Sequence, residues 1–170
     1  MSIHYRKLLP KDSKEYRKIR LECLEKYPNN FGSTFQEERT RPKLAFEEYI
    51  EQQTNGKFFT GAFNDEELIG ICGFSQEQKP KTRHIGTIIQ MYVRAEYGGK
   101  GVGLELLNTV IEEAFKIPEI EQLLLGVVAI NTSANRIYEQ AGFQQYGLLK
   151  NYFKADNAYS DQRLMVLYRK

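Results

Sequence analysis

Three features are missing from this chain of 170 residues, and each absence excludes a class of protein. Its two cysteines, Cys23 and Cys72, lie far apart with no second thiol or histidine at a metal-ligand spacing, which argues against a zinc site. The start of the chain has no apolar run long enough for a signal peptide or a bilayer span. Acidic and basic residues are mixed along the whole length, with a formal net charge of +2, so nucleic acid is not implied as a partner.

The composition that remains is that of an ordinary globular protein, with 41% hydrophobic and 27% charged residues. The length suits one domain that buries a real core, and there is no internal repeat and no low-complexity linker. We therefore expect a single domain over residues 1–170, in the cytoplasm with reduced thiols, without a metal and without a membrane partner.

The first third of the chain predicts a strand followed by two helices. Residues 3–8 alternate as a strand does, and Asp12 with Glu15 predicts a capping box at the start of the first helix. Apolar residues then recur at helical spacing until Pro28. A second helix is expected just after Pro42, with a loop between the two.

The middle of the chain changes to strand patterns and then returns to a helix. Residues 58–63, 68–74 and 85–93 are β-rich runs separated by turn signals, which predict three antiparallel strands. Apolar residues at helical spacing over 102–114 predict a helix. Residues 123–130 form a continuous apolar run, typical of a strand buried on both faces.

The last part of the chain predicts a short helix over residues 132–140 and two strands, at 143–152 and 163–168. The complete order of elements indicates an α/β domain built on a single mixed, largely antiparallel sheet flanked by helices. This fold class alone leaves the function open.

The most informative segment has the sequence GGKGVG at residues 98–103, between the strand that ends near Val93 and the helix that begins near Val102. Glycines let the backbone approach a ligand closely, and free amides at a helix N-terminus attract anions. A flexible loop without a ligand is the alternative. Four glycines in six residues at a strand-to-helix junction favour a phosphate or pyrophosphate site.

Two common nucleotide patterns do not fit this loop. A Walker sequence requires Lys and then Ser or Thr after its last glycine, but Leu104 follows Gly103. A dinucleotide fingerprint counted from Gly99 has Gly101 in place and then Leu104 where the third glycine belongs. The hypothesis of a nucleotide-binding protein therefore depends on the glycine loop alone, and the spacing of its glycines does not fit.

The loop resembles instead the pyrophosphate loop of the GNAT acyltransferase superfamily, Q/R-x-x-G-x-G/A, which also follows a strand. Residues 91–93 resemble the family's splayed fourth strand, and residues 131–143 resemble its N-x-x-A-x-x-L-Y-x-x-x-G-F segment. Tyr159, Asp161 and Met165 resemble its usual C-terminal strand. The motifs stand in the correct order, and the order of strands matches the family across nearly the whole chain.

The resemblance implies a GNAT-like acyl-CoA-binding fold and an N-acetyltransferase, in which an amine attacks the thioester of acetyl-CoA directly. The acceptor would be a small-molecule or peptide amine, and a homodimer is possible. A non-catalytic acyl-CoA sensor or partner-binding module is the alternative, because fold does not imply activity. Gly98, where the family has Gln or Arg, and a fourth strand without a carboxylate favour that alternative slightly.

The resemblance also assigns residues to the co-substrate. The fourth-strand main chain would pair with the pantetheine arm and stabilise the oxyanion, while the loop amides hold the pyrophosphate and Lys100 replaces part of the charge lost at Gly98. Asn131 would bind the arm, and Tyr138, two helical turns later on the same face, would protonate the leaving thiolate. A plain helix cap and a packed aromatic are their respective alternatives. The expected cofactor-binding set is Met91, Tyr92, Val93, Gly99, Lys100, Gly101, Val102, Gly103, Leu104, Asn131 and Tyr138.

The general base and the acceptor are less well defined. Residues 87–90 hold no carboxylate, so we expect a water chain, fed by His84, Glu37 or Glu38. The acceptor candidates are Phe31, Phe35, Glu37 and Glu38, whose rings and carboxylates suit a cationic amine or a plain amphipathic loop equally. Polyamine, antibiotic, amino acid, small metabolite and protein amine all remain as acceptors.

Overall fold

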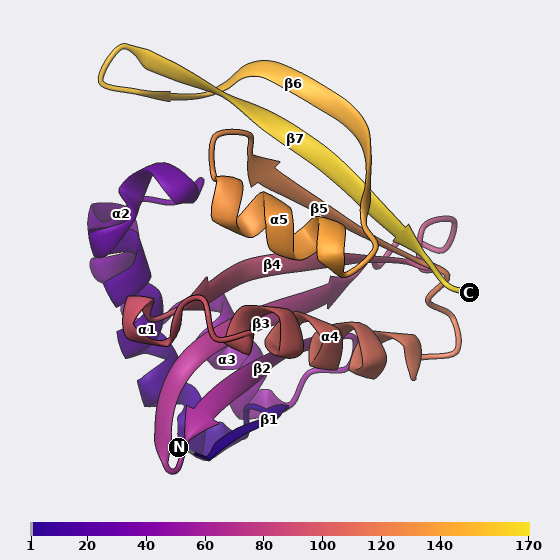
Figure 1. Cartoon of the computed structure of the whole chain (residues 1–170). Helices are drawn as coiled ribbons and strands as arrows, with labels where there is room; N and C mark the ends of the chain where they lie inside the picture. The colour runs from indigo at the N-terminus through magenta and orange to yellow at the C-terminus, as the bar shows by residue number, and fades with distance from the viewer. Residues whose placement is uncertain (1) are drawn as a thin grey trace.

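The computed structural model describes residues 2–170, and its strands form one seven-stranded sheet in the order β1-β2-β3-β4-β5-β7-β6 (Figure 1). Neighbouring strands are antiparallel except for the parallel pair β4 and β5. The predicted mixed, largely antiparallel sheet is therefore confirmed. The strands are β1 (Ile3–Lys7), β2 (Lys57–Asn64), β3 (Glu67–Gln76), β4 (Ile85–Val93), β5 (Gln122–Val128), β6 (Gln144–Ala155) and β7 (Ala158–Tyr168).

Helices cover both faces of the sheet. Helices α4 and α5 pack on one face and α1 and α3 on the other, while the β6–β7 hairpin extends past the rest of the molecule (Figure 1). The helices are α1 (Ser13–Lys26), α2 (Phe35–Arg39), α3 (Ala45–Gln52), α4 (Val102–Phe115) and α5 (Thr132–Gln140), with short 3₁₀ turns η1 (Pro10–Asp12), η2 (Pro28–Asn30) and η3 (Ala95–Tyr97).

Two hydrophobic cores, one on each face, hold the central strands. Leu106 and Leu107 of α4 are completely buried against Phe74 of β3, and Ile19 of α1 is buried with Phe59 of β2 on the opposite face. Each such side chain contributes roughly 1.5–3 kcal/mol by leaving water. Because β2, β3 and β4 are packed from both sides, the strand that carries the predicted co-substrate residues has a fixed position.

Several predicted boundaries need correction. The loop expected between the first two helices contains α2, whose start is capped by Thr34 Oγ1 accepting a hydrogen bond from Glu37 N at 3.1 Å. Strand β5 ends at Val128, two residues before the predicted end, and Ile130 is exposed. The expectation that this strand is buried on both faces is also wrong at Gly126, which is exposed.

The predicted capping box of Asp12 and Glu15 is wrong as well. The first turn of α1 has no side-chain cap, because the Asp12 carboxylate turns back toward β1. There it accepts a hydrogen bond from Leu9 N at 2.7 Å and a fork of two from Arg6, at 2.7 and 3.1 Å. Asp12 thus fixes the entry of α1 to the first strand instead of capping the helix.

We expect Asp12→Asn to lower the free energy of unfolding by about 1–2 kcal/mol at neutral pH, because the ion pair with Arg6 is largely shielded from water. Burial by itself would raise the pKa of Asp12, but the hydrogen bonds from Arg6 and Leu9 and the charge of Arg6 outweigh it and lower the pKa. The stabilisation is therefore present above the ordinary pKa of Asp and is lost as the pH falls through the lowered value.

Urea titrations at several pH values test this expectation. The difference between wild type and Asp12→Asn should shrink toward zero at acid pH. Glu15→Gln, the other half of the predicted capping box, is the control, because its only ion pair is with exposed Lys18 and should be worth less than ~0.5 kcal/mol. Equal losses in the two variants would contradict this account of Asp12.

Candidate active site

The parallel strands β4 and β5 separate partway along their length. They pair only where Ile85, Gly86 and Thr87 face residues 122–124, and no strand partner lies on this side of β4 beyond that point. At Gln90 the backbone has a φ of +50°, and the pairing of β4 with β3 is irregular there, as in a bulge. The free N–H and C=O groups of residues 88–93 are thus available to an extended ligand, as at a sheet edge.

A groove of about 940 Å³ lies at this divergence. Its walls come from three parts of the sequence: the segment after α1, the stretch from the end of β4 through the loop to the start of α4, and α5 with its N-cap. Nine of the residues predicted from the sequence line it, namely Phe31, Met91, Tyr92, Val93, Gly99, Gly101, Gly103, Leu104 and Asn131. The fold therefore brings together most of the predicted co-substrate residues in one elongated site.

The glycine loop gives this groove an anion-binding wall. Gly99 and Gly101 have φ values of +68° and +80°, and nothing lies within 4 Å of where their Cβ atoms would be. Gly101 is the N-cap of α4, and no side chain caps the helix. The amides of the first turn are therefore free, and the helix dipole favours a negative group in the open space beside them.

Gly98, which stands where the family's loop motif has Gln or Arg, has a steric explanation. Its φ of −65° does not require glycine, but a Cβ there would lie 3.0 Å from the carbonyl oxygen of Ala95, which accepts the hydrogen bond of Gly98 N. A side chain at this position would press on the 3₁₀ turn η3. The turn therefore favours glycine at the place where the family has Gln or Arg.

Three predicted members of the co-substrate set do not line the groove with their side chains: Lys100, Val102 and Tyr138. Val102 is buried in the core, so only its main chain is available at the helix start. Lys100 points away, because its Nζ donates a hydrogen bond to the Glu96 carbonyl at 2.9 Å. Lys100 is thus badly placed to replace the charge that Gly98 lacks.

Asn131 lines the groove, whereas Tyr138 does not. Asn131 also caps the helix, accepting a hydrogen bond from Ala134 N at 3.3 Å. Tyr138 is only 7% exposed and packs edge-on against Phe143, outside the groove lining. Burial, with a smaller effect of the Cys72 thiol, raises the pKa of Tyr138, so its hydroxyl stays protonated.

The sequence reading missed the groove face of α5. Thr132, Arg136 and Gln140 all line the groove at four-residue spacing, which could have indicated a common face. Arg136 is exposed, and its guanidinium has no hydrogen bond or ion pair within residues 2–170. It is the cation that α5 presents to the groove.

Only one of the four acceptor candidates lines the groove. Phe31 does so, next to Tyr27 and Asn30, which the sequence reading missed. Phe35 instead faces the guanidinium of Arg39, 5.6 Å from the ring centre. The segment after α1 does contribute to the groove, but only through its first part, residues 27–31.

None of the three residues predicted to take part in a proton relay, His84, Glu37 and Glu38, lines the groove. Glu37 forms an ion pair with Arg41 at 3.2 Å, and His84 lies six residues before Gln90, roughly 20 Å along an extended strand. Glu38 has no side-chain hydrogen bond or ion pair within residues 2–170. Burial raises the pKa of Tyr16 most, and the charge of Glu38 is one of the smaller causes that also raise it. The Tyr16 hydroxyl donates a hydrogen bond to Gln90 Oε1 at 2.8 Å.

A half-buried ion pair joins α1 to the residue that follows β4, beside the groove. Glu22 accepts a hydrogen bond from the Tyr92 hydroxyl at 2.9 Å and pairs with Arg94 at 3.0 Å. Burial favours a raised pKa for Glu22, but the hydrogen bonds from Arg94 and Tyr92 outweigh it and lower the pKa. The carboxylate therefore stays charged, and the groove wall formed by Tyr92 stays in place.

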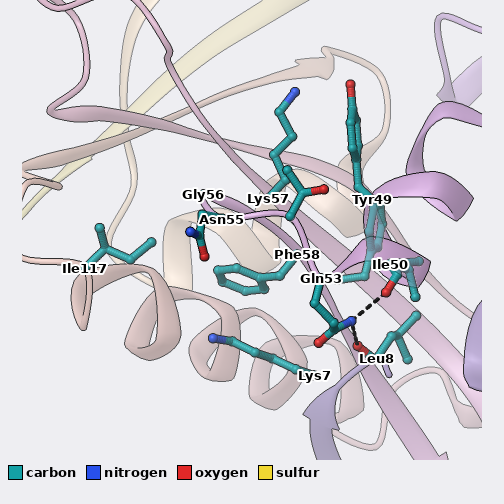
Figure 2. A pocket seen from close by; sticks show the side chains of 12 residues that line it. Lys7, Leu8, Tyr49, Ile50, Gln53, Asn55, Gly56, Lys57, Phe58 and Ile117 are labelled. Carbon is teal, nitrogen blue, oxygen red and sulfur yellow. Dashed lines mark hydrogen bonds between the residues drawn. The ribbon is translucent and has the colours of Figure 1, made fainter. Parts of the chain in front are cut away.

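A smaller cavity of about 230 Å³ lies between the end of α3 and the start of β2 (Figure 2). Two of its polar side chains are already bonded within the protein: Gln53 Nε2 donates to the carbonyls of Leu8 and Ile50, at 3.3 and 2.6 Å, and Lys7 pairs with Glu113 at 2.9 Å. It contains none of the predicted site residues. The groove is therefore the better candidate for the active site.

Two further searches cover the described part of the chain. None of its helices is long and apolar enough to cross a membrane. Residues 2–170 contain no group of three or more His, Cys, Asp and Glu side chains arranged to hold a metal ion.

Comparison with known proteins agrees with this geometry. The chain is similar to a GNAT-family acetyltransferase from Streptococcus pneumoniae (TM-score 0.82, 22% identity, covering 99% of this chain and 100% of that one). It is also similar to the yncA protein of Salmonella typhimurium, whose structure contains acetyl-CoA (TM-score 0.85, 18% identity, covering 99% and 94%). At these identities the likeness shows the fold.

Curated relatives match over shorter stretches. The spermidine N(1)-acetyltransferase of Vibrio cholerae is 30% identical over 84 residues, which is 49% of this chain and 49% of that protein. Across two curated relatives the chain spans 49% and 66% of their lengths. The family model for the acetyltransferase (GNAT) family matches residues 16–143, which include β4, the glycine loop, α4 and α5. On this match the chain belongs to the GNAT acetyltransferase family.

Proposed function

We propose that this chain transfers the acetyl group of acetyl-CoA to an amine in the groove between β4 and β5. One observation carries the proposal: a free strand edge and an uncapped, glycine-lined helix start lie along the same groove. The pantetheine arm has amide groups at a spacing that suits a strand edge, and the pyrophosphate suits free helix amides. Few ligands other than a coenzyme A thioester combine the two.

The assignment of individual residues extends this proposal. The main chain of Met91 and Val93 holds the arm, and an N–H of this segment stabilises negative charge on the thioester oxygen. The amides of residues 99–104 hold the pyrophosphate. Asn131 keeps its capping bond and offers its amide group to the arm. Arg136, with no partner within the described residues, supplies the cation in place of Gly98 and Lys100.

The acceptor amine must be neutral when it attacks, so its proton needs a path to water or to a base. Strand β4 offers Gln90 and no carboxylate at the bulge. Of the two carboxylates among the candidates, Glu37 is paired with Arg41 whereas Glu38 has no ion pair within the described residues, so we assign the relay to Glu38 through water.

Similarity to the curated relatives does not identify the acceptor. The names of the curated relatives range from spermidine and aminoglycoside acetyltransferases to an N-acetylaspartate synthetase. The alternative of a non-catalytic acyl-CoA-binding module would show CoA binding with no acetylation of any amine. A panel of amines with acetyl-CoA, followed by release of free thiol, separates the two.

The loop assignment predicts that Gly101→Asp loses at least tenfold in acetyl-CoA affinity, because the new carboxylate would repel the pyrophosphate. Gly101→Asn is the matched control: it has nearly the same size and also tolerates the left-handed φ of this position. Calorimetry should show the large loss for the Asp variant alone. Unchanged affinity in a folded Gly101→Asp protein would refute the assignment.

The assignment of Arg136 predicts that Arg136→Gln weakens acetyl-CoA binding about three- to tenfold, as expected for one partly exposed charge-assisted contact. Lys100→Gln should change the affinity less than twofold, since Lys100 already binds the Glu96 carbonyl. Titrations at two salt concentrations should show a weaker salt dependence for Arg136→Gln. If Lys100→Gln lost more acetyl-CoA affinity than Arg136→Gln, Lys100 and not Arg136 would be the cation that binds the pyrophosphate.

Tyr138 remains our proposed general acid because it matches the family's Tyr and its hydroxyl stays protonated. Its side chain does not line the groove, but its neighbours on α5, Ala134 and Ile137, do. A thiol has a reference pKa near ~8.5 and leaves without much help, so Tyr138→Phe should lower kcat only about 10- to 100-fold with little change in CoA affinity. Because the pKa lies above its ordinary value of 10.0, the ratio of wild-type to variant rates should stay constant from pH 7 to about 9.5. An unchanged kcat where chemistry limits the rate would leave Tyr138 a packed aromatic.

A further inference from the structure

Arg20 on α1 is a buried cation for which the chain supplies no anion. The residue is 4% exposed, and its Nε is fully buried without a hydrogen-bond acceptor. Its Nη1 has only the Cys23 sulfur at 3.7 Å, and no carboxylate oxygen within residues 2–170 lies within 4.0 Å of the guanidinium. Arginine stays ionised in proteins, and a buried ion without a counter-ion is costly.

Carboxylates are present near Arg20, but they do not pair with it. Arg17, three residues earlier, is paired with Glu47 at 2.7 Å. Glu22, two residues later, is committed to Arg94 at 3.0 Å and to the Tyr92 hydroxyl. The carboxylates around Arg20 therefore all serve other cations or lie out of its reach.

Arg20 also lies directly behind the wall of the groove. The guanidinium carbon is 5.3 Å from the ring centre of Phe31, and Phe31 lines the groove. One helical turn before Arg20, the Tyr16 hydroxyl binds Gln90, next to the groove residue Met91. Arg20 itself does not line the groove, so a group in the groove reaches its guanidinium only past the ring of Phe31, which would have to shift.

We propose that Arg20 binds a carboxylate of the acceptor, so that the acceptor is an amino-acid-like compound carrying both an amine and a carboxylate. This inference rests on the proposed acetyl transfer and names its substrate class. Arginine binds carboxylates through two parallel hydrogen bonds, and the bound anion would neutralise the buried charge.

A purely cationic acceptor fits this side of the groove poorly. Polyamines and aminoglycosides would bring positive charge toward a guanidinium that already lacks an anion. The rings expected to attract a cation already face the protein's own guanidinium groups, Phe31 that of Arg20 and Phe35 that of Arg39. Glu37 is likewise paired, with Arg41. These contacts weigh against the cationic amine that the sequence alone suggested.

The first test uses the wild-type protein and needs no variant. The twenty L-amino acids are compared with their C-terminal amides, which keep the amine and the side chain but lose the negative charge, and with spermidine and an aminoglycoside. Free thiol release from acetyl-CoA gives kcat and KM for each. We expect the best acceptor to be an amino acid, with kcat/KM about ten- to a hundredfold above that of its amide.

The second test assigns this preference to Arg20. Arg20→Gln should raise KM for the amino acid and leave its amide nearly unchanged, so that the acid-to-amide ratio falls toward one. Arg20→Lys keeps the charge without the fork and should restore part of the ratio. Arg17→Gln, on the same helix, should keep the wild-type ratio. A purely structural Arg20 would instead lower thermal stability and affect both acceptors equally.

The outcomes separate the two proposals. If wild type acetylates spermidine or the amides as well as the amino acids, or acetylates no amino acid at all, the assignment of Arg20 is overturned while acetyl transfer stands. A folded Arg20→Gln protein that keeps the wild-type acid-to-amide ratio overturns it too. If no amine in the panel is acetylated although acetyl-CoA binds, the proposed acetyl transfer fails and this inference fails with it.

Discussion

The groove exists because β4 and β5 share only three residue pairs before they diverge. A parallel pair that ends so early leaves one edge of β4 without partners, which a protein ordinarily covers or pairs. Here the edge is held open: α4 packs against β4 on one face, and the ion pair of Glu22 with Arg94 ties the end of β4 to α1 on the other. The glycine loop follows directly from the end of this strand, so the strand edge and the helix start occupy the same groove without any further element to position them.

The parts of this site that the sequence predicted are those with local causes. Gly99 and Gly101 have a left-handed backbone, and α4 begins immediately after them, so the signal that predicted an anion site is local. The prediction that Asn131 and Tyr138 reach one ligand stays a prediction, and it depends on an equally local detail. Asn131 is the N-cap of α5, with a φ of −77° and a ψ of 76°, and is not a helical residue. Asn131 lines the groove, whereas Tyr138 is buried in the core.

Contacts between distant residues were out of reach of pattern reasoning. The partner of Asp12 is Arg6 on the preceding strand, and the partner of Glu22 is Arg94, 72 residues later in the chain. Periodicity places a carboxylate on a helix face but does not say which cation the tertiary fold brings to it. The β6–β7 hairpin is a different case: its turn at Asp156 and Asn157, both with positive φ, was visible in the sequence but was not used.

The two halves of the proposed active site differ in how they depend on sequence. The acetyl-CoA half is built mainly from main-chain groups of β4, the glycine loop and the start of α4, so it tolerates wide changes in side chains. The acceptor half depends on side chains of α1 and the segment after it. Helix α1 is fixed near both ends, through Asp12 to β1 and through Glu22 to Arg94 after β4, and the guanidinium of Arg20 between them has no counter-ion within residues 2–170. Under our proposal the acceptor supplies that anion, which would make α1 the element that sets acceptor specificity.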